Sequence, residues 1–257
     1  ASVFVGLHLD RPAGVGFLPT GTRFQAQLYV TDQSDRPGRP VADRTLVTPG
    51  LRVVRPPGPG AWDFDLHAAW QAGTSRPNAT PQPGPRLDHR AQFYHAEAGY
   101  SVGKLRLAAL YDWAGGDRAP DDGANNRFDT LFGARGFEYG HTGISGAFAR
   151  SNITGPGLRA EWREAGPVDG RVTYRPYWLA ARTDAWTTAG LRDPAGQSGR
   201  FVGHQVEGRV RWWAWLRRLR LEAGFTYLSE GRFRRSVPGS PQNGAMTFVY
   251  TQALFRF

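Results

Sequence analysis

Hydrophobic and polar residues alternate along several segments of this 257-residue chain. In the clearest segment, Ala61 to Gln71, one face carries Trp62, Phe64, Leu66, Ala68 and Trp70, and the other carries Asp63, Asp65, His67 and Gln71. A period of two over this length predicts a β-strand with one apolar and one polar face. The same alternation recurs at 23–30, 94–101, 104–113, 158–163, 205–212 and 218–227, with shorter candidates at 3–10, 51–55 and 171–181.

Many strands that each expose an apolar stripe are typical of a transmembrane β-barrel, because every second residue faces lipid. Aromatic residues at the ends of these stripes match the two membrane interfaces. We therefore predict an all-β, antiparallel transmembrane barrel with about 10–12 strands in this chain. A soluble sandwich or a lipocalin-like protein shows the same alternation, but it does not account for the aromatic ends.

The last segment, Met246 to Phe257, ends the chain on an aromatic residue. Phe257 and Phe255 lie on one alternating face with Ala253, Thr251 and Val249. A terminal aromatic preceded by apolar residues at alternate positions resembles the C-terminal assembly signal of outer-membrane barrels. We expect Phe255 and Phe257 to be bound by the barrel assembly machinery.

The connections between the predicted strands differ in length. Long segments rich in Pro, Gly, Asp and Arg occupy 31–46, 72–88, 113–128, 184–200 and 232–244, whereas 102–103 and 167–170 are short. Alternating long and short connections are typical of extracellular loops and periplasmic turns. No second domain is indicated, so residues 1–257 are predicted to be one barrel domain. No signal peptide precedes Ala1, so the sequence is expected to be a mature chain or a portion of a longer one.

Composition narrows the class further. Aromatic residues make up 13% of the chain, although its mean hydropathy is only −0.48. No run approaches the roughly 20 apolar residues of a membrane-spanning helix, so a helical membrane protein is excluded. The absence of cysteine excludes disulfides and thiolate metal sites.

The chain carries a formal net charge of +10, nearly all of it from arginine, since Lys104 is its one lysine. A basic excess indicates an anionic partner: nucleic acid, lipid head groups or an acidic solute. No nucleic-acid-binding motif accompanies the charge, so nucleic acid is not expected as a partner.

Several short motifs resemble the alginate export family of outer-membrane barrels. They are Phe128-Asp129-Thr130-Leu131-Phe132, Tyr139-Gly140-His141, Ser151-Asn152-Ile153, Gly157-Leu158-Arg159, Tyr177-Trp178-Leu179-Ala180, Asp193 to Gly199, and Val202-Gly203-His204-Gln205. Their order and spacing carry the resemblance, which is strongest over 128–257. The family implies a monomeric barrel in the outer membrane of a Gram-negative bacterium, surrounded by lipid. Its basic lumen would pass an anionic polysaccharide, uronate-type saccharides or other small anions. Family barrels have more strands, about 18, so we expect this chain to be a C-terminal portion of such a barrel, or else a smaller relative.

Alternation places a set of charged residues on the predicted lumen face. The arginines are Arg106, Arg159, Arg163, Arg175, Arg209, Arg211 and Arg220, and the carboxylates include Glu97, Glu161 and Glu207. An arginine-lined channel attracts anions, and guanidinium binds carboxylates through two parallel hydrogen bonds. In the alternative interpretation, these Arg–Glu pairs only hold the strands together in a plugged structural barrel.

An outer-membrane enzyme is the other alternative. The six histidines are scattered, and no nucleophile motif is present. His67 with Asp65, or His95 with Glu97, share a strand face and could pair, although hydrogen bonds in the lumen are the commoner role. We predict no catalytic site, no metal site and no cofactor.

Overall fold

The computed structural model describes residues 2–13, 16, 18–35, 41–76, 84–119, 121–132, 146–163, 166–215, 218–241 and 244–256. Within them, the chain forms twelve strands and one short helix, which confirms the all-β prediction and its strand number. The elements are β1 (Ser2–Pro12), β2 (Arg23–Gln33), β3 (Arg44–Arg55), β4 (Trp62–Ser75), β5 (Leu87–Val102), β6 (Leu105–Ala114), β7 (Ala124–Asn125), β8 (Ile153–Arg163), β9 (Val168–Trp178), β10 (Phe201–Ala214), β11 (Leu219–Leu228), α1 (Arg232–Ser236) and β12 (Met246–Phe255).

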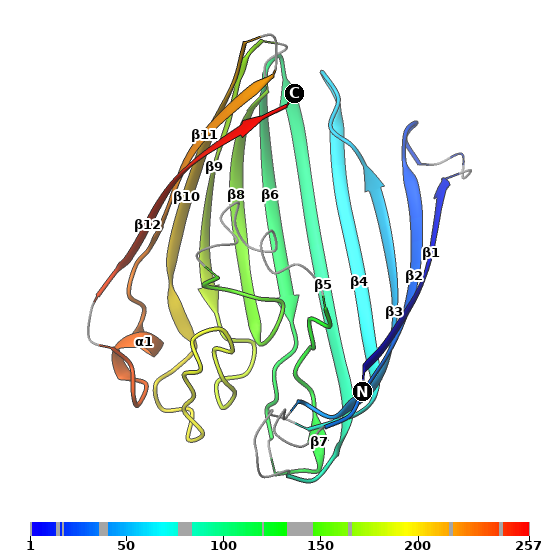
Figure 1. The fold of residues 1–257 in the computed structure, drawn as a ribbon, viewed down its shortest axis with the longest axis vertical. Helices are drawn as coiled ribbons and strands as arrows, with labels where there is room; N and C mark the ends of the chain where they lie inside the picture. The colour runs from blue at the N-terminus through cyan, green and yellow to red at the C-terminus, as the bar shows by residue number, and fades with distance from the viewer. Residues whose placement is uncertain are drawn as a thin grey trace.

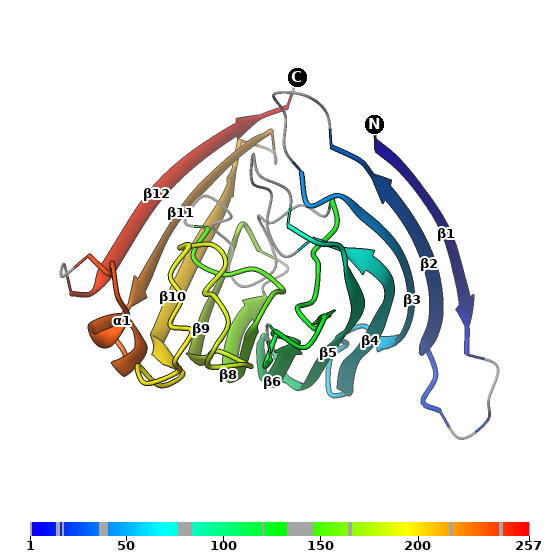
Figure 2. The ribbon, with the colours of Figure 1, turned by 90° about the horizontal axis from the view of Figure 1, so that it is seen from below.

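The strands form a single meander (Figure 1). From β1 to β12, each long strand pairs antiparallel with the next long strand along the chain. The two-residue β7 lies off this path and pairs parallel with the start of β5. Among the described strands, β1 and β12 do not pair with each other, so the sheet is open between them (Figure 2).

The two kinds of connection lie at opposite ends of the sheet (Figure 1). The long connections follow β4, β6, β9 and β11, and the short ones follow β3, β5, β8 and β10, whereas the connections after β1 and β2, residues 13–22 and 34–43, are equal in length. The expected alternation of long and short connections is therefore present from β3 onward. None of the helices in the described part of the chain is long and apolar enough to cross a membrane.

The outer face of the sheet is apolar, as the alternation predicted. Leu7, Trp62, Leu107, Leu158 and Trp162 are each more than half exposed on this face. Burying such a band in lipid removes apolar surface from water and stabilises by about 25 cal/mol per Å². The opposite face of the same strands carries polar and charged side chains that are mostly buried.

The hydrophobic core lies inside the curve of the sheet, at the end with the long connections. The segments 115–132 and 146–152, which connect β6 to β8, fold inward there (Figure 2). Phe128 and Phe148 from these segments pack on Phe93 of β5 and Tyr177 of β9. We call these two inward segments the inner plug. The inner plug fills one end of the space inside the curved sheet, and polar side chains line the other end.

Several strands begin earlier than the alternation predicted. β3 starts at Arg44, β5 at Leu87 and β8 at Ile153, so parts of the predicted loops 31–46 and 72–88 belong to strands. In the predicted loop 113–128, residues 113–114 belong to β6 and residues 124–125 form β7. The predicted turn 167–170 was also wrong in part, because residues 168–170 already pair in β9. At the long-connection end, inner residues such as Ala69 and Phe93 are apolar because the inner plug covers them. The two-faced pattern therefore fades although the strand continues.

Candidate functional site

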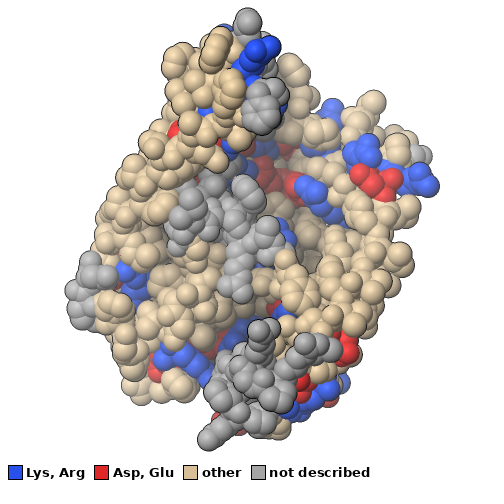
Figure 3. Space-filling model, viewed as in Figure 1, with Lys and Arg blue, Asp and Glu red and all other residues tan. Residues whose placement is uncertain are grey.

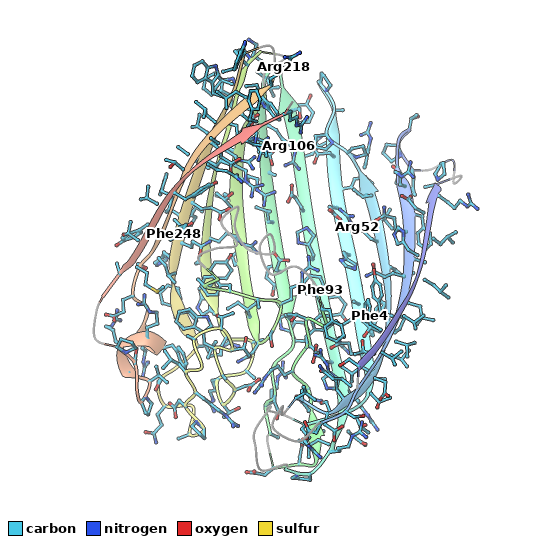
Figure 4. All side chains as sticks on the ribbon, in the orientation of Figure 1. Phe4, Arg52, Phe93, Arg106, Arg218 and Phe248 are labelled. Atoms are coloured by element: carbon cyan, nitrogen blue, oxygen red, sulfur yellow. The ribbon has the colours of Figure 1, made fainter. Side chains whose placement is uncertain are left out.

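The inner wall of the sheet carries the charged side chains. Figure 3 shows blue and red side chains in the hollow and a largely uncharged outer surface, and Figure 4 places Arg52 and Arg106 on neighbouring parts of this wall. These residues lie on the polar face of strands whose other face is apolar, so the alternation of β-structure alone brings them together. This charged wall is the candidate functional site.

Arg106 of β6 lies at the centre of the densest cluster. Its guanidinium donates to both oxygens of Asp63 at 3.0 and 3.1 Å, to Glu97 at 2.7 Å and to Glu161 at 3.2 Å. Arg159 of β8 donates to the other oxygen of Glu97 at 2.9 Å. Arg106 and Asp63 are both almost fully buried. Four predicted residues, Arg106, Arg159, Glu97 and Glu161, thus share one network, together with Asp63 from β4.

The other predicted arginines also pair with carboxylates. Arg175 binds Asp112, Arg211 lies 2.7 Å from Asp169, Arg209 lies 4.0 Å from the same carboxylate, and Arg220 lies 3.9 Å from Glu222. The predicted Glu207 faces Arg171 at 3.7 Å, an arginine that the sequence analysis had not selected. The side chain of Arg163 and the whole of Phe257 lie outside the described residues. Phe255 lies on the outer face near the end of β12.

Two glycines of the inner wall let the arginines lie flat against it. A Cβ atom at Gly99 would lie 2.5 Å from Nη2 of Arg106, and one at Gly157 would lie 2.8 Å from Cγ of Arg175. Because no side chain occupies these two positions, both guanidinium groups run along the wall. The space inside the sheet therefore remains open.

Three cavities follow one another along the inner wall. The central cavity has a volume of about 650 Å³, and its lining includes five arginines and four carboxylates. A second cavity of about 240 Å³, at the long-connection end, is lined by Arg44, Arg76 and Arg127 and by Asp129 as its carboxylate. A third, of about 310 Å³ at the short-turn end, has three lining arginines against two carboxylates. Each described cavity thus has more arginines than carboxylates.

Besides Arg171, two further arginines that line the central cavity were not predicted. Arg52 of β3 binds Asp65 and donates to Gln25 at 3.2 Å. Arg150 enters the cavity from the inner plug and places its guanidinium 4.7 Å from the ring centre of Phe93. Arg52 could have been selected from the Leu51–Arg55 strand candidate. Arg150 could not, because it follows a loop whose inward path is not encoded in local alternation.

The suggested histidine pairs are wrong. His95 lies 2.8 Å from Asp112 on the next strand, so its partner is Asp112 and not Glu97. His67 lies 2.8 Å from Gln27, and Asp65 binds Arg52 instead. In both cases the histidine pairs across strands within a polar network. Among the described residues, no group of three or more His, Asp or Glu side chains is placed to hold a metal ion.

Asn152 joins the inner plug to the wall. It is fully buried, and its side chain accepts a hydrogen bond from Ala181 N–H at 2.7 Å. It also donates to the carbonyl groups of Ala181 and Ala185 at 3.1 and 3.0 Å. Its φ of 49° is a left-handed conformation, which asparagine tolerates better than most residues. One side chain therefore ties the segment before β8 to the connection between β9 and β10.

A second polar contact holds the start of the plug. Asp184 accepts hydrogen bonds from Asp117 N–H at 2.9 Å and from Nε of Arg127 at 2.8 Å. The Asp117 carboxyl group is itself buried, and one of its oxygens has no hydrogen-bond partner. Burial, together with the nearby Asp184 carboxylate, raises the pKa of Asp117. The plug therefore contains an aspartate that is easier to protonate than usual.

The motif residues behind the family resemblance mostly build this plug. Phe128, Asn152, Tyr177, Leu179 and Val202 are all buried around it. In the segment 193–199, the Asp193 carboxylate accepts the N–H groups of Ala195 and Ser198 at 3.0 and 2.7 Å and closes a turn. The segment Tyr139-Gly140-His141 lies outside the described residues. Most of the described motif positions thus shape the inward loops, whereas Arg159 belongs to the charged wall.

Comparisons with known proteins agree with this architecture. A structure of OmpT with loop L8 deleted, an outer membrane protein of Vibrio cholerae, matches 98% of this chain and 62% of its own, with a TM-score of 0.50 and 10% identity. A Salmonella typhi OmpF structure in complex with daunomycin matches 96% of this chain and 61% of its own, with a TM-score of 0.50 and 13% identity. This chain therefore spans about three fifths of each matched chain, and identities this low show the fold alone. No protein of curated function matches the sequence.

The family comparison covers far more of the chain than the motifs did. The model of the family described as alginate export matches residues 20–248, which is nearly the whole chain. The strand count, the apolar outer face and the charged inner wall are those of an outer-membrane β-barrel wall. The chain therefore belongs to the alginate export family.

Proposed function

We propose that this chain forms the wall of an outer-membrane channel that passes anionic solutes, with anionic polysaccharide or uronate-type saccharides as the substrate class. The observation that carries the proposal is the row of three cavities along the inner wall, each with more arginines than carboxylates. An excess of fixed positive charge in a narrow, partly desolvated passage favours anions over cations.

Arginine suits this substrate class for a geometric reason. Its planar guanidinium can bind a carboxylate through two parallel hydrogen bonds, and uronate residues carry one carboxylate each. Arg171 is a favourable candidate, since its nearest carboxylate oxygen, on Glu207, is 3.7 Å away. A contact of that length leaves the guanidinium able to turn toward a passing anion.

We also propose where this channel lies and what it contacts. The exposed apolar band would contact the lipid of a Gram-negative outer membrane, and the chain would act as a monomer, without a cofactor and without nucleic acid. The assembly machinery would bind β12 through Phe255 and Phe257. A bilayer does not tolerate unpaired strand edges, so the working channel requires the edges of β1 and β12 to be paired.

A specific observation favours a second candidate, a plugged structural barrel. Every predicted arginine with a described side chain lies within 4.0 Å of a carboxylate, and the inner plug fills one end of the space inside the curved sheet. In that case the network only holds the strands together, and little current would flow. The two candidates differ in a measurable quantity, the ion conductance. We propose no catalytic activity for either one.

The test is the reversal potential of the full-length protein in a planar bilayer under a salt gradient, with and without an added oligouronate. We expect anion selectivity, and we expect the oligouronate to block the current. Arg171→Gln should move the reversal potential toward zero, whereas Arg90→Gln, an exposed arginine on the outer face of β5, should leave it unchanged. Cation selectivity or an absence of current would refute the proposal and support the plugged barrel.

A further inference from the structure

The inner wall carries a pair of aromatic rings as well as charges. Phe4 of β1 and Tyr29 of β2 stack there with an offset, their ring centres 5.5 Å apart and their planes inclined by 16°. Phe4 is 46% exposed, and Tyr29 lines the central cavity. Figure 4 labels Phe4 on β1, below Arg52 of β3. The polar wall therefore contains a stacked pair of aromatic rings at the central cavity.

The backbone holds Tyr29 in this orientation. Gly6 lies directly opposite Tyr29 in the register of β1 and β2. A Cβ atom at Gly6 would lie 2.8 Å from Cδ1 of Tyr29, so the ring lies flat on the strand in the space that the glycine leaves. One face of the ring is thereby directed away from the wall, toward the cavity.

The second ring is supported from the inner plug. Phe132 packs edge-on against Phe4, with centres 5.5 Å apart and planes at 81°. The guanidinium of Arg44 lies 5.1 Å from the Phe132 ring centre, and Arg44 also binds Asp129. The aromatic pair is thus fixed at the border between the plug and the open part of the lumen.

Hydrogen-bonding side chains line the same cavity beside the rings. Gln27 and Gln25 occupy the two inner positions of β2 that precede Tyr29, about 7 Å and about 14 Å from it along the strand. Arg52 lies on the adjacent strand and donates to Gln25 at 3.2 Å. A flat ring surface with amide and guanidinium groups at its edge is complementary to a pyranose, which has apolar C–H faces and hydroxyl groups around its rim.

We propose that Phe4 and Tyr29 form a stacking platform for a pyranose ring of the transported saccharide. The sugar C–H groups carry slight positive charge and lie against the negative ring faces. Gln27 binds the hydroxyl or carboxylate groups at the rim of this ring, and Gln25 and Arg52 bind those of a further sugar unit along the same saccharide chain. The inference rests on the proposed passage of saccharides, and it adds a contact that does not depend on substrate charge.

Calorimetric titration of the full-length protein in detergent tests the platform without needing an open pore. The two probes are a hexauronate and a neutral glucose hexasaccharide, and the variants are Phe4→Leu and Tyr29→Leu. We expect each variant to bind both probes about tenfold more weakly, which corresponds to about 1.4 kcal/mol. Phe24→Leu is the matched control, because Phe24 lies on the outer face of β2. The affinity of this variant for both probes should stay within about twofold of that of the original protein.

The outcomes separate this proposal from the channel proposal. Unchanged affinity in both variants, or no binding of either probe to the original protein, overturns the platform. If the bilayer shows no anion selectivity but neutral saccharide binding falls in Tyr29→Leu, the platform stands and the anionic substrate does not. A heat-modifiable gel shift confirms that each variant is folded. Tyr29→Phe, which keeps the ring, should restore most of the affinity.

Discussion

Replacement of Arg106 by methionine tests whether the buried network stabilises the sheet. The Arg106 and Asp63 side chains are 4% and 2% exposed. Removing one partner of a buried ion pair leaves the other charge without compensation, which costs about 3–5 kcal/mol. Arg159 still contacts Glu97 and Glu161, so Asp63 is the carboxylate most affected. We therefore expect the free energy of unfolding to fall by an amount near the lower limit, about 3 kcal/mol at pH 8.

The free energy of unfolding is measured by guanidinium chloride titration in detergent micelles, followed by tryptophan fluorescence. Asp63→Asn in the Arg106→Met background should recover most of the loss, because it removes the uncompensated charge. Arg90→Met on the exposed outer surface is the control and should change stability by less than about 0.5 kcal/mol.

Either of two results would contradict a stabilising role for the buried Arg106–Asp63 pair. One is a loss below about 1 kcal/mol for Arg106→Met at pH 8, which would match an exposed ion pair rather than a buried one. The other is a double-mutant cycle in which the losses of Arg106→Met and Asp63→Asn simply add, since Arg106 and Asp63 would then show no coupling.

Three further predictions concern the plug and the wall. Asn152→Ala removes three hydrogen bonds of about 1 kcal/mol each, so we expect faster proteolysis of the plug and a larger single-channel current. Asp117→Asn should stabilise the plug at neutral pH, because the raised pKa of Asp117 means that stability is lost as the pH rises through it. This gain, measured by hydrogen exchange, should vanish below the ordinary aspartate pKa of 3.8. Gly99→Ala should push Arg106 off the wall and lower both conductance and stability, whereas an unchanged conductance would contradict the flat packing.

Alternation predicted the membrane-facing half of the structure well, because one cause, lipid on one side, acts on every strand. Trp62, Leu107 and Trp162 are exposed on the outer face as expected. Where the inner plug packs on the wall, both faces of a strand are apolar. Ile153 and Phe93 lie in such regions, and there the strand ends were missed. A periodicity of two cannot show that a distant loop covers the second face.

The charged wall could be predicted as a set but not as pairs. His95 and Glu97 share a strand face, yet positions two apart on a strand are about 7 Å apart, whereas directly opposed residues of neighbouring strands are about 5 Å apart. Asp112 is the residue opposite His95, and it is the actual partner. Register therefore decides the pairs, and register depends on turn lengths that composition does not show.

The meander of neighbouring strands has a consequence for the order of folding. Hairpins between adjacent strands close short stretches of chain, whereas Asn152 and Asp184 join segments that are far apart in sequence or lie in different loops. Contacts between distant segments form more slowly, since more chain entropy must be lost first. The sheet can therefore assemble strand by strand before the plug docks. Trp62 on the outer face and Trp186 in the core are natural fluorescent reporters for these two stages.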